Sequence, residues 1–323
     1  MNGRSIADAL IEAPIVTSFT RLGYEARSRL EGWAPLDDYD LSGQVIVVTG
    51  ATSGLGRAAA EQLARCGATL VVVGRNGERN ERVIAELAAS TGNPSITQIP
   101  ADMGDLEQVR HLAERVLAAH DRLDVLIHNA GALDPEHRVA PGGTEATVAS
   151  QVVGPVLLTM LLLDRLAASA PARVLTMSSG GMYATGLKVS ELEMAPENYN
   201  GTEQYARAKR AQVTLNEMWA DRYGDLGVTF HALHPGWADT PGVDAGLPTF
   251  AKVMGPFLRT PKQGADTLVW LAADDTALAS NGRFWLDRAP RPIHKLPTTR
   301  GTDTAERRNR LWDWVAATAD ATQ

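Results

Sequence analysis

The stretch VIVVTGATSGLG, residues 45–56, limits the folds open to this chain more than any other feature of the sequence. Its first four residues are β-branched and apolar, which is typical of a strand buried on both faces. Glycines follow at Gly50, Gly54 and Gly56, and residues 55–66 are rich in Ala, Leu, Glu and Arg, which favours a helix. The sequence therefore predicts a buried strand, a tight turn and a helix in direct succession.

This turn brings bare backbone N–H groups and the positive end of a helix dipole to one point. Because glycine has no Cβ, a phosphate can approach the backbone closely. A glycine cluster alone could be a structural loop, but the strand before it and the helix after it favour a dinucleotide-binding element. We expect pyrophosphate contacts from Gly50, Thr52, Ser53, Gly54, Leu55 and Gly56.

Strand-like and helix-like segments alternate along the rest of the chain. Strands are predicted at residues 69–73, 95–99, 125–127, 172–177, 228–233 and 283–287, and helices at 76–90, 105–120, 146–166, 203–223, 261–273 and 304–319. This alternation predicts an α/β fold, a doubly wound parallel sheet of Rossmann type that binds ligands at the carboxyl ends of its strands. We expect one domain over residues 41–290, an N-terminal helical extension over 1–40, and a C-terminal extension with a terminal helix over 291–323.

Composition narrows the classes of partner and location. The chain has 323 residues and a formal net charge of −7, which argues against a nucleic-acid-binding surface. Its one cysteine, Cys66, cannot form an internal disulfide, so we expect a reducing, cytoplasmic location. The sequence has no run of about 18 apolar residues, so we predict no transmembrane segment. We expect no metal site, because His128, His231 and His234 lack a local pair of ligands.

For two segments the sequence does not settle what their apolar residues pack against. Residues 5–30 interleave apolar residues with arginines, which predicts short amphipathic helices interrupted at Pro14. The apolar residues are Ile6, Leu10, Ile15, Phe19, Leu22 and Leu30, and the arginines are Arg21, Arg27 and Arg29. The segment is either a lid on the domain's own surface or a peripheral contact with a membrane. Residues 146–166 are apolar all around the predicted helix, and we expect this helix to be buried at the interface of a homo-oligomer.

Tyr205 and Lys209 are four residues apart on a predicted helix and therefore share one face. A nearby ammonium stabilises a tyrosine phenolate, so the tyrosine can exchange a proton with a substrate oxygen closer to neutral pH. Ser179 follows the strand at 172–177, where its hydroxyl can donate a hydrogen bond to the same oxygen. The three residues together indicate acid–base chemistry at a carbonyl or alcohol.

Arg75 follows the second predicted strand, at the position that usually distinguishes the two nicotinamide cofactors. An acidic residue there would bind the adenosine ribose of NAD, whereas a guanidinium suits the 2′-phosphate of NADP. The sequence therefore favours NADP over NAD. The alternative is an ordinary solvent-exposed arginine.

These motifs stand in an order that resembles the short-chain dehydrogenase/reductase family. The motifs are Thr49-Gly50-x-x-x-Gly54-x-Gly56, Asn129-Ala130-Gly131, Ser179, Tyr205-x-x-x-Lys209 and Pro235-Gly236. The resemblance implies that Tyr205 is the acid/base, that Ser179 orients the carbonyl, and that Lys209 contacts the cofactor ribose. It also implies cofactor contacts from Tyr205, Asp102, Met103, Asn129, Ala130, Gly131, Pro235, Gly236 and Thr240.

Further segments are similar to the subfamily called dehydrogenase/reductase member twelve: GYE, SSGGM, YARAKRAQ, HPGWADTPGV and QGADT. The stretch LKVSELEMAPENYNG is similar to retinol-dehydrogenase-like reductases and implies a bulky, lipophilic substrate. Family members usually carry asparagine in an Asn-x-x-Gly pattern that supports a proton relay, whereas this chain has Gln151. The extra methylene is expected to shift the relay. Trp237 either walls the substrate pocket or simply packs within its loop.

We predict an NADP(H)-dependent oxidoreductase that transfers a hydride between nicotinamide and a carbonyl or alcohol carbon, with Tyr205 handling the proton. Two alternatives stay open. The chain could bind NADP(H) as a scaffold or sensor with little turnover, or it could be a nicotinamide-dependent lyase or epimerase. The sequence specifies neither the substrate nor the direction of the reaction.

Overall fold

In the part of the chain that the computed structural model describes, residues 8, 11–12 and 15–320, eight strands form one sheet. Their order is β3-β2-β1-β4-β5-β6-β7-β8, and every neighbouring pair is parallel except β7 with β8. The strands are β1 Val45–Thr49, β2 Thr69–Gly74, β3 Ile96–Pro100, β4 Val125–His128, β5 Ala172–Met177, β6 Val228–Leu233, β7 Arg283–Leu286 and β8 Ala289–Arg291. The strand order reverses between β1 and β4, which is where such sheets bind their ligands.

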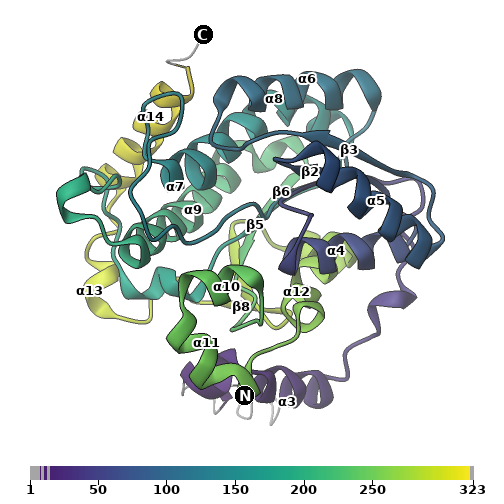
Figure 1. The fold of residues 1–323 in the computed structure, drawn as a ribbon, viewed down its shortest axis with the longest axis horizontal. Coiled ribbons are helices and arrows are strands. Elements are labelled where there is room, and N and C mark those ends of the chain that lie inside the picture. The colour runs from purple at the N-terminus through teal and green to yellow at the C-terminus, as the bar shows by residue number, and fades with distance from the viewer. Residues whose placement is uncertain (1–7, 9–10, 13–14, 321–323) are drawn as a thin grey trace.

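Helices cover both faces of the sheet (Figure 1). On one face α6, α8, α9 and α14 contribute to one buried apolar cluster, and on the other α4, α5 and α12 contribute to a second. The helices are α2 Ile15–Phe19, α3 Arg21–Glu31, α4 Gly54–Arg65, α5 Gly77–Thr91, α6 Leu106–Ala119, α7 Ala146–Val148, α8 Gly154–Ala168, α9 Gly201–Tyr223, α10 Pro241–Gly246, α11 Pro248–Met254, α12 Pro261–Ala273, α13 Pro297–Arg300 and α14 Ala305–Asp320. The predicted doubly wound α/β fold is confirmed.

Side-chain caps determine where several helices begin. Asp105 accepts hydrogen bonds from the first backbone N–H groups of α6, and Asn200 accepts one from Glu203 N at the start of α9. Thr260 and Gln263 form a reciprocal capping box at the start of α12. Because α9 carries the predicted catalytic pair, the cap at Asn200 helps to fix the rotation of that pair about the helix axis.

The long apolar helix lies in the core. The most apolar 18-residue stretch of the helix over Ala146–Ala168 has a mean hydropathy of 1.9, and among the described helices this one alone is long and apolar enough to span a membrane. Its most apolar stretch is 78% buried within the molecule, however, as expected of a core helix. The C-terminal helix α14 packs against α8 through a cluster that includes Leu311 and Val315. The chain's own terminal helix thus covers part of the surface that the sequence suggested for a subunit interface.

The helix over 146–168 is interrupted by a π-helical turn, η2, at Ala149–Val153. Sequence periodicity predicted one continuous helix and did not reveal this turn. A π-turn widens the helix by one residue, and such turns occur frequently at functional sites. Gln151 lies in its middle.

The N-terminal extension packs on the domain. Phe19 is 3% exposed and Arg27 is fully buried, while Leu22 and Leu30 of α3 are exposed. The observed packing agrees with the interpretation of this segment as a lid. Ile6, Leu10 and Pro14 lie outside the described residues. The boundaries of the three predicted regions stay predictions.

The sequence did not predict strand β8, which lies within residues 288–302. A tight turn at Asp287 and Arg288, both with positive φ (54° and 52°), returns the chain as β8, antiparallel to β7. Asp287 adopts this uncommon conformation while its carboxylate is buried between Arg27 and Arg259. The short helices α10, α11 and α13 were also missed. Each begins with a proline and is too short to show a periodic pattern.

Candidate active site

The glycine turn after β1 and the segment after β4 form one unit. Gly50 has a φ of 68°, and a Cβ there would lie 2.7 Å from Ala130 Cα. A Cβ on Gly56 would overlap the side chain of Asn129. Asn129 Nδ2 donates hydrogen bonds to Thr49 O at 3.0 Å and to Gly50 O at 3.2 Å. Asn129 therefore braces the turn, and only glycine fits at Gly50 and Gly56 without movement of the backbone.

The start of α4 is open to an anion. Thr52, Ser53 and Leu55 surround Gly54, whose φ is 52°, and the Ser53 side chain makes no capping hydrogen bond to the helix. The first N–H groups of α4 are therefore left for a ligand. Thr240 faces this turn, with its Cβ 3.4 Å from the position that a Cβ on Gly54 would occupy. The structure thus brings the loop after β6 against the glycine turn. Both segments were predicted to contact the cofactor.

The predicted adenosine end lies at the carboxyl ends of β2 and β3. Arg75 is exposed, and its side chain makes no hydrogen bond or ion pair with any described residue. Arg79, which sequence reasoning missed, donates from Nη2 to Thr52 O at 3.4 Å. A second guanidinium therefore lies at the edge of the same turn. Asp102 accepts a hydrogen bond from Gly104 N at 2.9 Å, and Met103 is buried beside the start of α8.

The predicted catalytic pair, Tyr205 and Lys209, lies on the inner face of α9. Lys209 is 2% exposed, its Nζ donates to Met177 O at 3.0 Å, and it lies 5.2 Å from the centre of the Tyr205 ring. Burial lowers the pKa of Lys209 to about 7. Burial also raises the pKa of the Tyr205 phenol, and the adjacent Ser179 hydroxyl partly offsets that shift. The free protein therefore holds Tyr205 as a neutral proton donor.

Ser179 is held at the end of β5 by contacts with both its neighbours and α9. Its Oγ accepts a hydrogen bond from Gly181 N at 3.1 Å, so the hydroxyl proton is left for another acceptor. The preceding residue, Ser178, donates from Oγ to Lys209 O at 3.0 Å. This bond ties the end of β5 to α9 and brings Ser179, Tyr205 and Lys209 together, as predicted from their order in the sequence.

Gln151 reaches the same point from the π-turn. Its Nε2 donates to Ala132 O at 2.8 Å, and its Oε1 is buried without a partner among the described residues. A Cβ on Gly131 would lie 2.9 Å from Gln151 Oε1 and 3.3 Å from Lys209 Nζ. The amide oxygen and the amine therefore converge beside Gly131, so the glutamine at this departure from the family pattern still reaches the predicted relay.

A residue that the sequence did not suggest holds this turn. Gln212, on α9, donates from Nε2 to the backbone oxygen of Gln151 at 2.6 Å. Backbone carbonyls in a π-turn do not all find partners within the helix, so a side-chain donor at this position stabilises the turn. The two residues are 61 positions apart in the sequence, and no local pattern could have linked them.

The loop after β6 closes the site on the remaining side. Pro235 is half-buried, and Gly236 has a φ of 73° with no room for a Cβ against Arg259. Trp237 packs edge-on against Phe19 and Phe250, with ring centres 5.7 Å and 5.1 Å away. Trp237 is thus a packed loop aromatic, and it keeps part of its surface exposed.

The sequence of residues 44–247 matches the family described as short chain dehydrogenase. The chain belongs to the short-chain dehydrogenase/reductase family. "Dehydrogenase/reductase SDR family member 12" of Homo sapiens is 37% identical over 290 residues, which cover 89% of this chain and 90% of the relative. "Retinol dehydrogenase 12" of Bos taurus is 32% identical over 310 residues, which cover 94% and 96%. The family and the member-twelve-like subfamily expected from the motifs are both confirmed.

Solved structures of the short-chain dehydrogenase/reductase family share this fold. A Beutenbergia cavernae protein with NADP bound at low occupancy is 27% identical, with a TM-score of 0.64 and coverage of 79% of this chain and 97% of the other. L-Sorbose reductase from Gluconobacter frateurii, at 22% identity and the same TM-score of 0.64, supports the fold alone. As a family member, this chain is an oxidoreductase that uses an NAD(P) cofactor on CH–OH or C=O groups of small molecules.

The residues present fit such a cofactor. The glycine turn leaves space where side chains would otherwise stand, and the N-terminus of α4 offers unpaired N–H groups for a pyrophosphate. Thr240 faces that turn from the loop after β6, which also contains Pro235 and Gly236. The structure thus places all the predicted cofactor contacts along the carboxyl edge of the sheet. Their individual roles stay predictions.

Proposed function

We propose that this protein is an NADP(H)-dependent oxidoreductase that interconverts carbonyl compounds and alcohols, with bulky, lipophilic molecules as substrates. One observation carries the proposal: Ser179, Tyr205 and Lys209 converge at the ends of β5 and α9, beside a glycine turn built for a dinucleotide. The bound cofactor supplies or accepts the hydride. The chain's own residues supply orientation and the proton.

In the reduction direction, Ser179 donates a hydrogen bond to the substrate carbonyl oxygen and Tyr205 donates the proton from its phenol. The phenolate left behind is stabilised by the Lys209 ammonium, so the proton that Lys209 carries matters for turnover. Burial sets the pKa of Lys209 to about 7, so the amine gains its proton near neutral pH. Gln151 Oε1 is buried without a partner among the described residues and lies on the Lys209 side of the site, so it is free to accept a hydrogen bond that supports the return of a proton to Tyr205.

Preference for NADP is supported by Arg75, which has no competing partner among the described residues, and by Arg79 beside Thr52. Both residues follow β2, and their guanidinium groups have the chemistry that binds an adenosine 2′-phosphate. The NADP found in a related structure agrees with this preference.

A bulky, lipophilic substrate is supported by the aromatic character of the loop beyond the nicotinamide side. Trp237 and Phe250 keep exposed surface there, and Val253 and Phe257 are 67% and 46% exposed. Exposed apolar surface in the segment that follows the Trp237 loop suits an apolar ligand. The relative named for retinol points to the same class.

Nicotinamide absorbance, followed with NADPH and NADH over retinoids, steroids, fatty aldehydes and quinones, tests the proposal. We expect turnover with at least one apolar class and a preference for NADPH. Binding of NADPH without turnover on any member of the panel would instead favour a scaffold or sensor. Product formed without net change in cofactor absorbance would favour a lyase or epimerase.

A further inference from the structure

We propose that residues 18–31 form a strap that sets the spacing of the two loops flanking the substrate, and that Phe19 thereby determines which carbonyl compounds the site accepts. The strap comprises the end of α2, the connection through Thr20, and α3. This inference rests on the proposed function for its substrate and adds a specificity-determining residue outside the family motifs. In Figure 1, α3 and α11 lie toward the same lower edge of the molecule.

Phe19 touches both loops at once. Its ring atom Cε2 lies 2.8 Å from the position that a Cβ on Gly180 would occupy, and Gly180 directly follows Ser179. Its backbone oxygen accepts a hydrogen bond from Trp237 N at 2.7 Å, and its ring packs against the Trp237 ring. Phe19 is 3% exposed, so it supports the two loops from the interior of the protein. A shift of this residue would therefore move Ser179 and Trp237 relative to each other.

Two buried arginines hold the backbone around Phe19. Arg259 donates to Ser18 O at 2.9 Å and to Thr20 O at 3.3 Å, and Arg27 donates to Ser18 O at 3.1 Å. Both guanidinium groups bind the carboxylate of Asp287 at 2.6 Å, and all three side chains are at most 1% exposed. Loss of one charge from such a buried group leaves another charge unpaired, at a high cost in free energy. The contacts among Arg27, Arg259 and Asp287 therefore hold the strap in one position on the domain.

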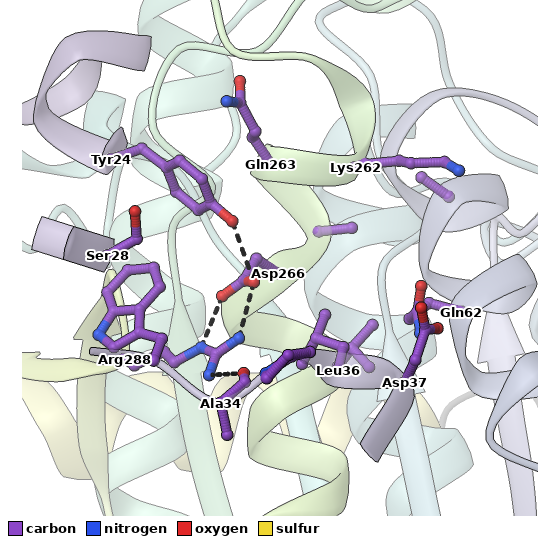
Figure 2. A pocket seen from close by; sticks show the side chains of 15 residues that line it. Tyr24, Ser28, Ala34, Leu36, Asp37, Gln62, Lys262, Gln263, Asp266 and Arg288 are labelled. Carbon is purple, nitrogen blue, oxygen red and sulfur yellow. Dashed lines mark hydrogen bonds and ion pairs between the residues drawn. The ribbon is translucent and has the colours of Figure 1, made fainter. Parts of the chain in front are cut away.

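A second set of contacts seats α3 on α12, as Figure 2 shows. The Tyr24 hydroxyl donates to Asp266 Oδ2 at 3.1 Å, and Arg288 binds the same carboxylate through Nε and Nη2 at 2.8 Å and 2.9 Å. Arg288 also lies over the Trp33 ring. These groups line a cavity of about 300 Å³ between the strap and α12, and they are engaged with one another.

The helix that receives this second set also supports the loop after β6. A Cβ on Gly264, in the first turn of α12, would lie 2.9 Å from Ala238 Cβ and 3.6 Å from Pro235 Cβ. The strap therefore contacts the loop directly through Phe19 and indirectly through α12. Phe19 contributes its ring and its backbone to the strap, and it carries no charge. Removal of the ring therefore leaves the ion pairs of Arg27 and Arg259 with Asp287 intact.

Phe19→Ala in the full chain tests the strap, with Leu311→Ala as the matched control. Leu311 is fully buried on α14, in a different apolar cluster from the one that contains Phe19, so its truncation also removes core volume without removing a contact of Phe19. We expect Phe19→Ala to change the ratio of kcat/KM for retinal to that for benzaldehyde by about tenfold, because small misplacements of orienting groups change reactivity strongly. The dissociation constant for NADPH is expected to stay within about twofold in both variants. Leu311→Ala is expected to lower the Tm and leave the ratio unchanged.

Hydrogen–deuterium exchange of the same proteins gives a readout that needs no substrate. Phe19→Ala is expected to speed exchange in residues 179–184 and 235–240, which Leu311→Ala leaves unchanged. Phe19→Leu keeps most of the apolar volume and serves if the alanine variant does not fold. Unchanged selectivity together with unchanged exchange would overturn the strap. Absence of turnover in the wild-type protein would overturn the proposed function instead, while the exchange result would still decide whether the strap holds the two loops.

Discussion

At the level of single residues, Tyr205→Phe tests the proposed proton donor, because it removes only the phenolic oxygen. The ring and its packing persist, so we expect turnover to fall by orders of magnitude while NADPH binding changes little. Steady-state kinetics and a fluorescence titration of NADPH measure the two effects. Retention of more than about a tenth of the activity, a loss of under roughly 1.4 kcal/mol, would mean that Tyr205 is not the proton donor.

Arg75 carries the corresponding prediction for the cofactor. Arg75→Ala is expected to weaken NADPH binding by roughly 1.5 to 3 kcal/mol, the range of a hydrogen bond to a charged group, and to leave NADH binding nearly unchanged. Arg79→Ala is expected to weaken NADPH binding less than Arg75→Ala does, since the Arg79 guanidinium already has a backbone partner at Thr52. Titrations of the wild type and both variants with NADPH and NADH measure these changes in binding. Equal losses for NADPH and NADH would show that Arg75 supports the loop and does not read the phosphate.

At the level of elements, the π-turn is built around glutamine. Gln151 is 1% exposed and its Nε2 donates to Ala132 O, so a shorter amide that did not reach this carbonyl would leave it unpaired at a cost of about 1–3 kcal/mol. We expect Gln151→Asn to be slower than the parent and Gln151→Leu to be slower still. Kinetics and thermal melting of both variants test this. A Gln151→Leu variant that matched the parent in turnover and Tm would remove position 151 from the relay.

Gln212→Ala probes the same element without touching the reacting groups. It removes the donor to Gln151 O and leaves the Gln151 side chain in place. We expect kcat to fall and the KM for the carbonyl substrate to change little, with partial recovery in Gln212→Asn if a bridging water restores the bond. A fall in Tm with unchanged kcat would limit Gln212 to a structural role.

At the level of the whole molecule, the sequence predicted what depends on local pattern. Buried β-branched runs and the alternation with helices predicted seven strands and their winding, and the order of the motifs predicted the group around Tyr205 and Lys209. The remaining features depend on contacts between distant segments. Asp287 turns the chain into β8 while Arg27, 260 positions away, binds its carboxylate. Gln212 and Phe19 likewise act on residues that the fold brings to them, and their own surroundings in the sequence give no sign of this.

The buried histidines of β4 and β6 make global stability depend on pH. Burial lowers the pKa of His231 to about 4 and that of His128 to about 3, from an ordinary value of 6.5. Below pH 6.5 the unfolded chain takes up protons that the folded chain does not, so the free energy of unfolding falls as the pH falls. For His231 alone the loss between pH 7.5 and 5 is about 2 kcal/mol.

Urea unfolding of the wild type, His231→Asn and His111→Asn at these two pH values tests this dependence. His231 is fully buried, and its Nε2 bonds to Ala277 O at 2.9 Å, so His231→Asn is expected to be less stable at pH 7.5. Its further loss on going to pH 5 is expected to be smaller than that of the wild type by about 2 kcal/mol, because one of the proton-binding differences has been removed. His111→Asn, at an exposed position on α6, should lose as much as the wild type. Equal pH dependence in all three proteins would mean that His231 carries its proton in the folded state, and burial would then not be what makes this protein sensitive to acid.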